Sequence, residues 1–196
     1  MHRSVEEFSV KTIEIGGLGA ALKALRLPFG KDVRSSIHSH IEDHDEIKNA
    51  LRYRTEMFVD ERDSKLISTL VKRGDEHAKV LRGVVVWCEI NAPRYWWQEC
   101  DTYRVGAERL SSNSTMHQQG QGMDEDTLVD MKEHLEEGTM QKRVWMFSYQ
   151  ALRRIYFQRR NHRLPQWRKF CKWIETLPFA EEFITIENER NDSNTD

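Results

Sequence analysis

A run of β-branched and aromatic residues at positions 84–88, Val-Val-Val-Trp-Cys, is the feature that most limits what this chain can fold into. It favours a β-strand covered on both faces, because successive side chains of a strand point to opposite sides. A buried helix segment is the alternative, since periodicity does not separate the two in so short a run. Pro93 then suits the first turn of an aromatic helix that extends to about Tyr103. Arg104 and a serine- and asparagine-rich loop follow, and such donors suit an anionic ligand.

Other patterns predict elements before this strand. The run Val-Lys-Thr-Ile-Glu-Ile at residues 10–15, closed by Gly16-Gly17, indicates a short strand. Leucines at helical spacing then indicate a helix that stops at Pro28. A second helix is expected to begin with Ser64 as its cap and to end at Gly74.

The C-terminal half is expected to be mainly helical. Residues 111–126 predict a mobile surface loop, and residues 124–137 a helix that ends at Gly138. Two further helices, the second beginning at Pro165, are expected to close the domain. Their apolar faces carry, in turn, Met146, Tyr149, Leu152 and Tyr156, and Leu164, Trp167, Phe170 and Ile174.

Length and composition set the class of protein. With 196 residues, 38% of them hydrophobic, the chain predicts a single domain at residues 1–188 and a disordered tail at 189–196. Its net charge of −2 argues against a general nucleic-acid binder. No apolar run approaches the roughly 20 residues of a membrane helix, and no signal peptide is visible, so we expect a cytoplasmic protein without a membrane partner. The three cysteines lack a CxxC pair and are interpreted as reduced core thiols.

A histidine-rich segment raises the question of a metal site. His38, His40 and His44 surround Glu42 and Asp43, and imidazoles and carboxylates are ligands for zinc or iron. The segment has weak periodicity and no supporting cysteine. We therefore interpret it as a solvated loop and expect no metal.

A basic run is the other candidate for ligand binding. It carries, without an intervening acid, Arg153, Arg154, Arg159, Arg160, Arg163, Arg168, Lys169 and Lys172. Part of this charge is expected to form a solvated helix face, and part to bind phosphate beside the next helix N-terminus. A surface for single-stranded nucleic acid, with Tyr156, Phe157 and Trp167 stacking bases, is a further alternative.

Several of these features, in this order, resemble the flavin-dependent (alternative) thymidylate synthases and their divergent, phage-encoded relatives. The resemblance covers residues 64–175. It rests on Gly74, His77, the apolar strand, Ala92-Pro93, the aromatic helix, Arg104, the serine loop and the basic segment at 152–167. It implies an α+β fold, with a small central antiparallel or mixed sheet packed with long helices in a single domain.

The resemblance also implies roles for individual residues. Arg104 and Ser114 would be catalytic. The substrate nucleotide would be bound by Glu99, Arg104, Ser114, Arg143 and Arg168, and the flavin by His77, Arg159 and His162.

The family signature, RHRxxSxNExSxRY, is only partly kept. The departures are Thr102 and Tyr103 at its first Arg and His, Ser111-Ser112 near its Asn-Glu, Met116 for its last Arg and His117 for its Tyr. Each lost charge-assisted hydrogen bond is worth about 1.5 to 3 kcal/mol, so flavin and dUMP would be held less tightly unless other residues substitute.

The activity implied is methylation of dUMP with FAD, using methylenetetrahydrofolate as one-carbon donor and NADPH as reductant. Family members are homotetramers with sites at subunit junctions, so a homotetramer is implied as well. The alternatives are a non-catalytic nucleotide-binding accessory protein, which keeps the fold without the reaction, and the single-stranded nucleic-acid binder.

Overall fold

The structure is a computed structural model, and it describes residues 7–29, 59–114 and 120–189. The histidine-rich segment at 38–44 lies outside the described residues, as do residues 115–119 and 190–196. No helix in the described ranges is long and apolar enough to cross a membrane.

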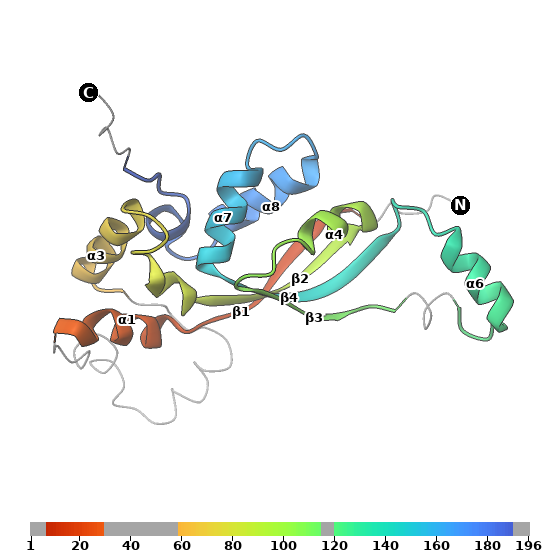
Figure 1. Cartoon of the computed structure of the whole chain (residues 1–196), viewed down its shortest axis with the longest axis horizontal. Helices are drawn as coiled ribbons and strands as arrows, with labels where there is room; N and C mark the ends of the chain where they lie inside the picture. Colours follow the sequence, from red (N-terminus) through yellow and green to blue (C-terminus); the bar gives the residue numbers. More distant parts are fainter. Residues whose placement is uncertain (1–6, 30–58, 115–119, 190–196) are drawn as a thin grey trace.

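Four antiparallel strands form the central sheet, in the order β1-β2-β4-β3 (Figure 1). They are β1 Ser9–Gly16, β2 Val85–Pro93, β3 Ala107–Ser112 and β4 Met140–Ser148. The apolar run at 84–88 thus lies in a strand from Val85 onward, and the helical alternative is wrong. Strand β2 lies between two partners, which explains its β-branched composition.

The two faces of β2 differ in burial. Val86, Cys88 and Ile90 are fully buried on one face, whereas Val85 and Trp87 on the other face are half-buried. The strand is therefore fully buried only on the face that packs against the helices, and not on both faces as expected.

Six helices and three shorter helical turns surround the sheet in the described part of the chain. The helices are α1 Leu18–Arg26, α3 Glu61–Lys72, α4 Arg94–Cys100, α6 Glu125–Glu133, α7 Tyr149–Arg159 and α8 Pro165–Glu175. The turns are the 3₁₀ segments Leu27–Phe29 and Lys79–Arg82 and the π-helical turn Ala180–Ile184. Helices α4, α7 and α8 lie on one face of the sheet, while α6 lies at the end away from α1 and α3 (Figure 1). The prediction of one α+β domain around a small antiparallel sheet is confirmed.

An aromatic cluster joins α4 and α8 to this face of the sheet. The ring of Trp96 lies 4.6 Å from Trp167 and 5.6 Å from Phe170, centroid to centroid. All three side chains are fully buried, and burial of a large apolar side chain stabilises a fold by about 1.5 to 3 kcal/mol. The cluster fixes the position of α4, and hence of the segment that follows it.

Several predicted boundaries are wrong. Met146 lies in β4 and not in a helix, because β4 continues to Ser148, whose hydroxyl accepts from the Ala151 N–H at 3.2 Å and begins α7. The first expected loop residue, at 111, lies in β3, a strand whose exposed side chains give no apolar alternation. Helix α3 begins at Glu61, with the Asp60 carboxylate as its cap, four residues before the expected cap at Ser64.

Two other ends differ as well. Helix α6 ends at Glu133, short of Gly138, and the aromatic helix α4 ends at Cys100, short of Tyr103. The expected helices that begin after a glycine pair and at Pro165 are confirmed as α1 and α8.

Candidate functional site

A cavity of about 1110 Å³ lies beside α7, between the segment that follows α4 and the C-terminal segment. Its walls carry five arginines and two acids. The lining residues are Asp75, Thr102, Tyr103, Arg104, Val105, Ala151, Arg153, Arg154, Phe157, Gln158, Arg159, Arg160, Glu187 and Asn188.

Three of the arginines have no carboxylate partner among the described residues. Arg104 is exposed in the turn after α4. Arg154 donates from Nη2 to the carbonyl oxygen of Val105. Arg153 is only 3% exposed and donates from its guanidinium to backbone and amide oxygens, none of which belongs to a carboxylate. Burial lowers the pKa of Arg153, and the cavity keeps a net positive lining.

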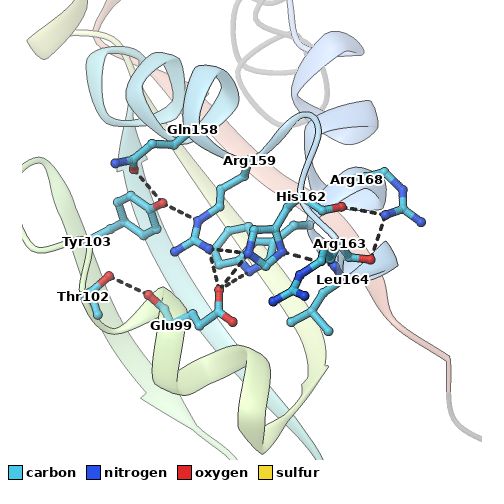
Figure 2. Close-up of polar contacts among 10 residues, drawn as sticks. Glu99, Thr102, Tyr103, Gln158, Arg159, His162, Arg163, Leu164 and Arg168 are labelled. Carbon is cyan, nitrogen blue, oxygen red and sulfur yellow. Dashed lines mark hydrogen bonds and ion pairs between the residues drawn. The ribbon is translucent and has the colours of Figure 1, made fainter.

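The fourth arginine, Arg159, belongs to a network that joins α4, α7 and α8 (Figure 2). Its Nη1 donates to Glu99 Oε2 at 2.5 Å, and its Nε donates to the Tyr103 hydroxyl at 2.7 Å. Glu99 Oε2 also accepts from the Trp167 indole at 2.9 Å. The Arg159 guanidinium lies 4.6 Å above the Trp167 ring. The charge and planar face of Arg159 are therefore already engaged by the protein.

Two more side chains complete the network. Tyr103 donates from its hydroxyl to Gln158 Oε1 at 2.8 Å, and burial raises the pKa of Tyr103. His162 places Nε2 2.9 Å from Arg159 Nη1, while its Nδ1 lies 3.2 Å from the Leu164 N–H. A neutral imidazole accepts at one nitrogen only, so these two donors compete for the ring.

Arg143 and Ser114 lie at the far end of the β3–β4 pair, outside the lining of the cavity. Arg143 donates from Nη1 to Asp101 Oδ1 at 2.9 Å, and its guanidinium lies 4.4 Å above the Trp97 ring. Ser114 follows the end of β3, next to Asn113, whose N–H donates to the Lys142 carbonyl. The two predicted nucleotide ligands thus share one end of the sheet.

The remaining predicted residues lie apart from both groups. His77 follows α3 with a half-exposed ring, 3.8 Å from Glu76 Oε1, and only its neighbour Asp75 lines the cavity. Arg168 donates from Nη1 to the carbonyl oxygens of His162 and Arg163. These hydrogen bonds stabilise the loop between α7 and α8.

The fold therefore brings some predicted site residues together and separates others. Arg104 and Arg159 line one cavity, and Glu99 and His162 contact Arg159 behind it. Sequence reasoning placed Arg153 and Arg154 in a general basic run without a specific role; the seven-residue separation of Arg153 and Arg160, about two helical turns, was the available signal. It gave Glu187 no role.

Within the described residues, no group of three histidine, cysteine, aspartate or glutamate side chains is arranged to hold a metal ion.

Comparisons with known proteins identify the fold. No family model and no curated protein sequence matches the chain. A crystal structure of thymidylate synthase X (ThyX) from Helicobacter pylori with FAD and dUMP is similar, with a TM-score of 0.59 and 14% identity over 91% of this chain and 97% of that one. A second structure of that enzyme, also with FAD and dUMP, gives 0.60 and 14% over 92% and 99%. The UMP/dUMP methylase PolB from Streptomyces cacaoi, bound with 5-Br dUMP, gives 0.59 and 13% over 93% and 96%. The chain has the fold of the flavin-dependent thymidylate synthases.

Proposed function

We propose that this protein is a flavin-dependent methylase that acts on a uracil deoxynucleotide such as dUMP. The observation that supports this most is the set of guanidiniums without carboxylate partners, Arg104, Arg153 and Arg154, that lines the cavity. Arginine is suited to phosphate, because its planar fork of donors matches two phosphate oxygens. The solved structures with this fold hold FAD and dUMP.

The cavity also fits the two chemical parts of FAD. Its arginines suit the diphosphate. Phe157 lines the same wall, with the guanidiniums of Arg153 and Arg160 4.7 and 4.9 Å from its ring centroid. Exposed Val105 offers an apolar surface for a flat ring. When bound, FAD would supply the electrons that accompany transfer of a methylene group from methylenetetrahydrofolate, with NADPH as the reductant. The residues of this chain would bind FAD and the nucleotide, orient them, and balance the negative charge of their phosphates.

The separation of the predicted residues is consistent with a site shared between subunits. Arg143 and Ser114, proposed to bind the nucleotide, lie outside the cavity that holds Arg104. In a homotetramer, the end of the β3–β4 pair that carries Arg143 and Ser114 in one copy would complete the cavity of another copy. We propose this assembly, in the cytoplasm, as the active form.

A non-catalytic nucleotide-binding protein is the second candidate. It is favoured by the engagement of Arg159, the expected flavin ligand, with Glu99. That pair leaves this guanidinium less free for an external ligand.

One experiment separates these candidates. The purified protein is titrated with FAD and dUMP by calorimetry, and then supplied with methylenetetrahydrofolate and NADPH while dTMP is followed by mass spectrometry. The methylase binds FAD and forms dTMP. The second candidate binds dUMP without product, and failure to bind FAD contradicts the methylase. Binding of a single-stranded oligonucleotide that falls steeply with salt and ignores dUMP would instead favour a nucleic-acid binder.

A further inference from the structure

The C-terminal segment after the π-helical turn forms one wall of the cavity. Arg153 holds this segment against α7, since its Nη1 donates to the carbonyl oxygens of Ile184 and Ile186 and its Nη2 donates to Asn188 Oδ1. These bonds hold the backbone at Ile186 and the side chain of Asn188, on either side of position 187.

A carboxylate is held on this wall. Glu187 Oε1 accepts from Arg160 Nη1 at 2.8 Å, and both residues line the cavity. The next anchor of the segment is the Glu189 N–H, which donates to the Lys72 carbonyl at 2.9 Å. Glu187 therefore lies between the anchors at Ile186 and Glu189, and its carboxylate forms an ion pair with Arg160 of the cavity.

Glu187 differs from the other acids near the cavity. Glu99, which neutralises Arg159, is not among the lining residues. Asp75 does line the cavity, but its carboxylate has no arginine within ion-pair distance in the described structure. Glu187 is thus the lining carboxylate that forms an ion pair with an arginine of the cavity.

We propose that Glu187 determines how much negative charge the cavity accepts in a phosphate ligand. This inference depends on the proposed function, in which the cavity binds phosphate groups. A phosphate monoester carries about two negative charges at neutral pH, and the internal diphosphate of FAD carries a similar charge, one on each phosphate. A terminal diphosphate carries more.

The selection follows from Coulomb attraction, which scales with the charge of the ligand. While Glu187 engages Arg160, the cavity lining holds three guanidiniums that no carboxylate contacts. Without that carboxylate it would hold four, and the added attraction would favour the more highly charged ligand. Glu187 is therefore a specificity residue that favours dUMP and FAD over nucleoside diphosphates and triphosphates.

The test compares inorganic phosphate with pyrophosphate. Both are titrated by calorimetry at low salt into the wild-type protein and into Glu187→Gln. Because the pair is partly exposed, we expect Glu187→Gln to tighten pyrophosphate binding about three- to fivefold, and phosphate binding by less than about twofold.

Two further variants separate charge from structure. Glu189→Gln makes the same change two residues away, outside the cavity lining, and is expected to leave both affinities unchanged. Arg160→Gln breaks the same ion pair from its other side. If Glu187 acts through its charge, Arg160→Gln weakens pyrophosphate binding; if the pair only holds the segment in place, both variants change affinity in the same direction.

The inference is overturned if Glu187→Gln behaves like Glu189→Gln, if it changes both anions equally, or if the wild-type protein binds neither anion. The proposed function has a separate readout, the binding of FAD and dUMP. A protein that binds FAD and dUMP but shows no effect of Glu187→Gln keeps the proposed function and loses this inference.

Discussion

The arginines of the cavity differ in how each guanidinium is satisfied. Arg159 and Arg160 are neutralised by carboxylates, Arg153 is held by neutral oxygens, and exposed Arg104 donates to no other described residue. A guanidinium already held by the protein gains less from a ligand than a free one, because its hydrogen bonds are only exchanged. Substitution of Arg104 should therefore weaken ligand binding, whereas substitution of Arg153 should mainly lower the stability of the fold.

Arg104→Ala should weaken ligand binding without affecting the fold. Loss of a charge-assisted hydrogen bond costs about 1.5 to 3 kcal/mol, so we expect the dissociation constants of dUMP or FAD to rise at least about tenfold. Calorimetric titration measures this. Arg62→Ala, an exposed arginine on α3, is the matched control and should bind as the wild type does. Equal affinities for the two variants would remove Arg104 from the site.

Arg153→Ala should act mainly on stability. It leaves the carbonyl oxygens of Ile184 and Ile186 without their buried donor, at a cost of about 2 to 4 kcal/mol in the free energy of unfolding. Urea denaturation measures the change. The exposed neighbour Arg154→Ala should cost less than about 1 kcal/mol. A stable Arg153→Ala protein would show that the C-terminal segment is held by other contacts.

At the scale of the elements, the turn between α4 and β3 decides where Arg104 stands. Gly106 adopts φ +74 in this turn, and its carbonyl oxygen accepts from the Ser148 N–H at 2.7 Å. A Cβ at Gly106 would lie 2.4 Å from Ser148 Oγ, the hydroxyl that caps α7. The turn and the start of α7 therefore depend on each other.

Gly106→Ala tests this dependence against Gly122→Ala. Gly122 also has a positive φ, +83, but a Cβ there has no atom within 4 Å. Both substitutions carry a backbone penalty of about 1 to 2 kcal/mol, and the clash at Gly106 should add about 1 to 3 kcal/mol. Thermal unfolding gives the difference. Similar losses for the two variants would mean that the turn relaxes away from α7.

Helix α6 should respond to acid through its cap. The hydrogen bonds from Thr127 lower the pKa of Asp124 below its ordinary value of 3.8. A carboxyl whose pKa is lowered by folding stabilises the helix above its unfolded pKa, and this support is lost as the pH falls through the lower, folded value. The protection factor of the Thr127 amide, measured by NMR as exchange relative to the intrinsic rate at each pH, should therefore fall below about pH 4. In Asp124→Asn the same probe should lose this pH dependence, and an unchanged profile would point to another acid.

The elements best predicted from sequence are those with a distinct composition or period. Strand β2 is expected from its β-branched and aromatic run, and helix α8 from apolar residues that recur at helical spacing. Strand β3 was not, because an edge strand with exposed side chains has no alternation to read. Met146 is predicted in a helix because Tyr149, Leu152 and Tyr156 continue its spacing. In the structure, the cap at Ser148 marks the position where β4 ends and α7 begins.

The candidate site was harder to predict for a related reason. Local pattern pointed to the basic run and to Arg104, and the resemblance pointed to Arg159. The partner of each arginine, such as Glu99 or Glu187, is distant in sequence, so which guanidinium stays free depends on tertiary contacts that no local pattern encodes.

For the whole molecule, the two groups of predicted residues define two separate regions. The cavity beside α7 and the far end of the β3–β4 pair are held by Glu99 of α4 and by Asp101, the residue after α4, respectively. In the proposed oligomer, a second copy would bring the two regions together.

Mixing inactive variants tests this requirement. If each active site takes its cavity from one copy and its sheet end from another, Arg104→Ala and Arg143→Ala should each be inactive alone. After subunit exchange, mixed oligomers should regain part of the activity, because some sites then contain neither substitution. Unmixed samples of each variant, exchanged with themselves, are the controls. No recovery in oligomers shown to be mixed by mass spectrometry would place both arginines in sites formed by one copy.

The fluorescence of the Trp167 indole should report on the cavity. Its ring packs beneath the Arg159 guanidinium and its N–H donates to Glu99, so it is buried one layer behind the cavity wall. A ligand that draws Arg159 away from Glu99 would change the electrostatic field at this indole and shift its emission. Fluorescence of the unlabelled protein, compared with Trp167→Phe, would then report occupancy of the cavity directly.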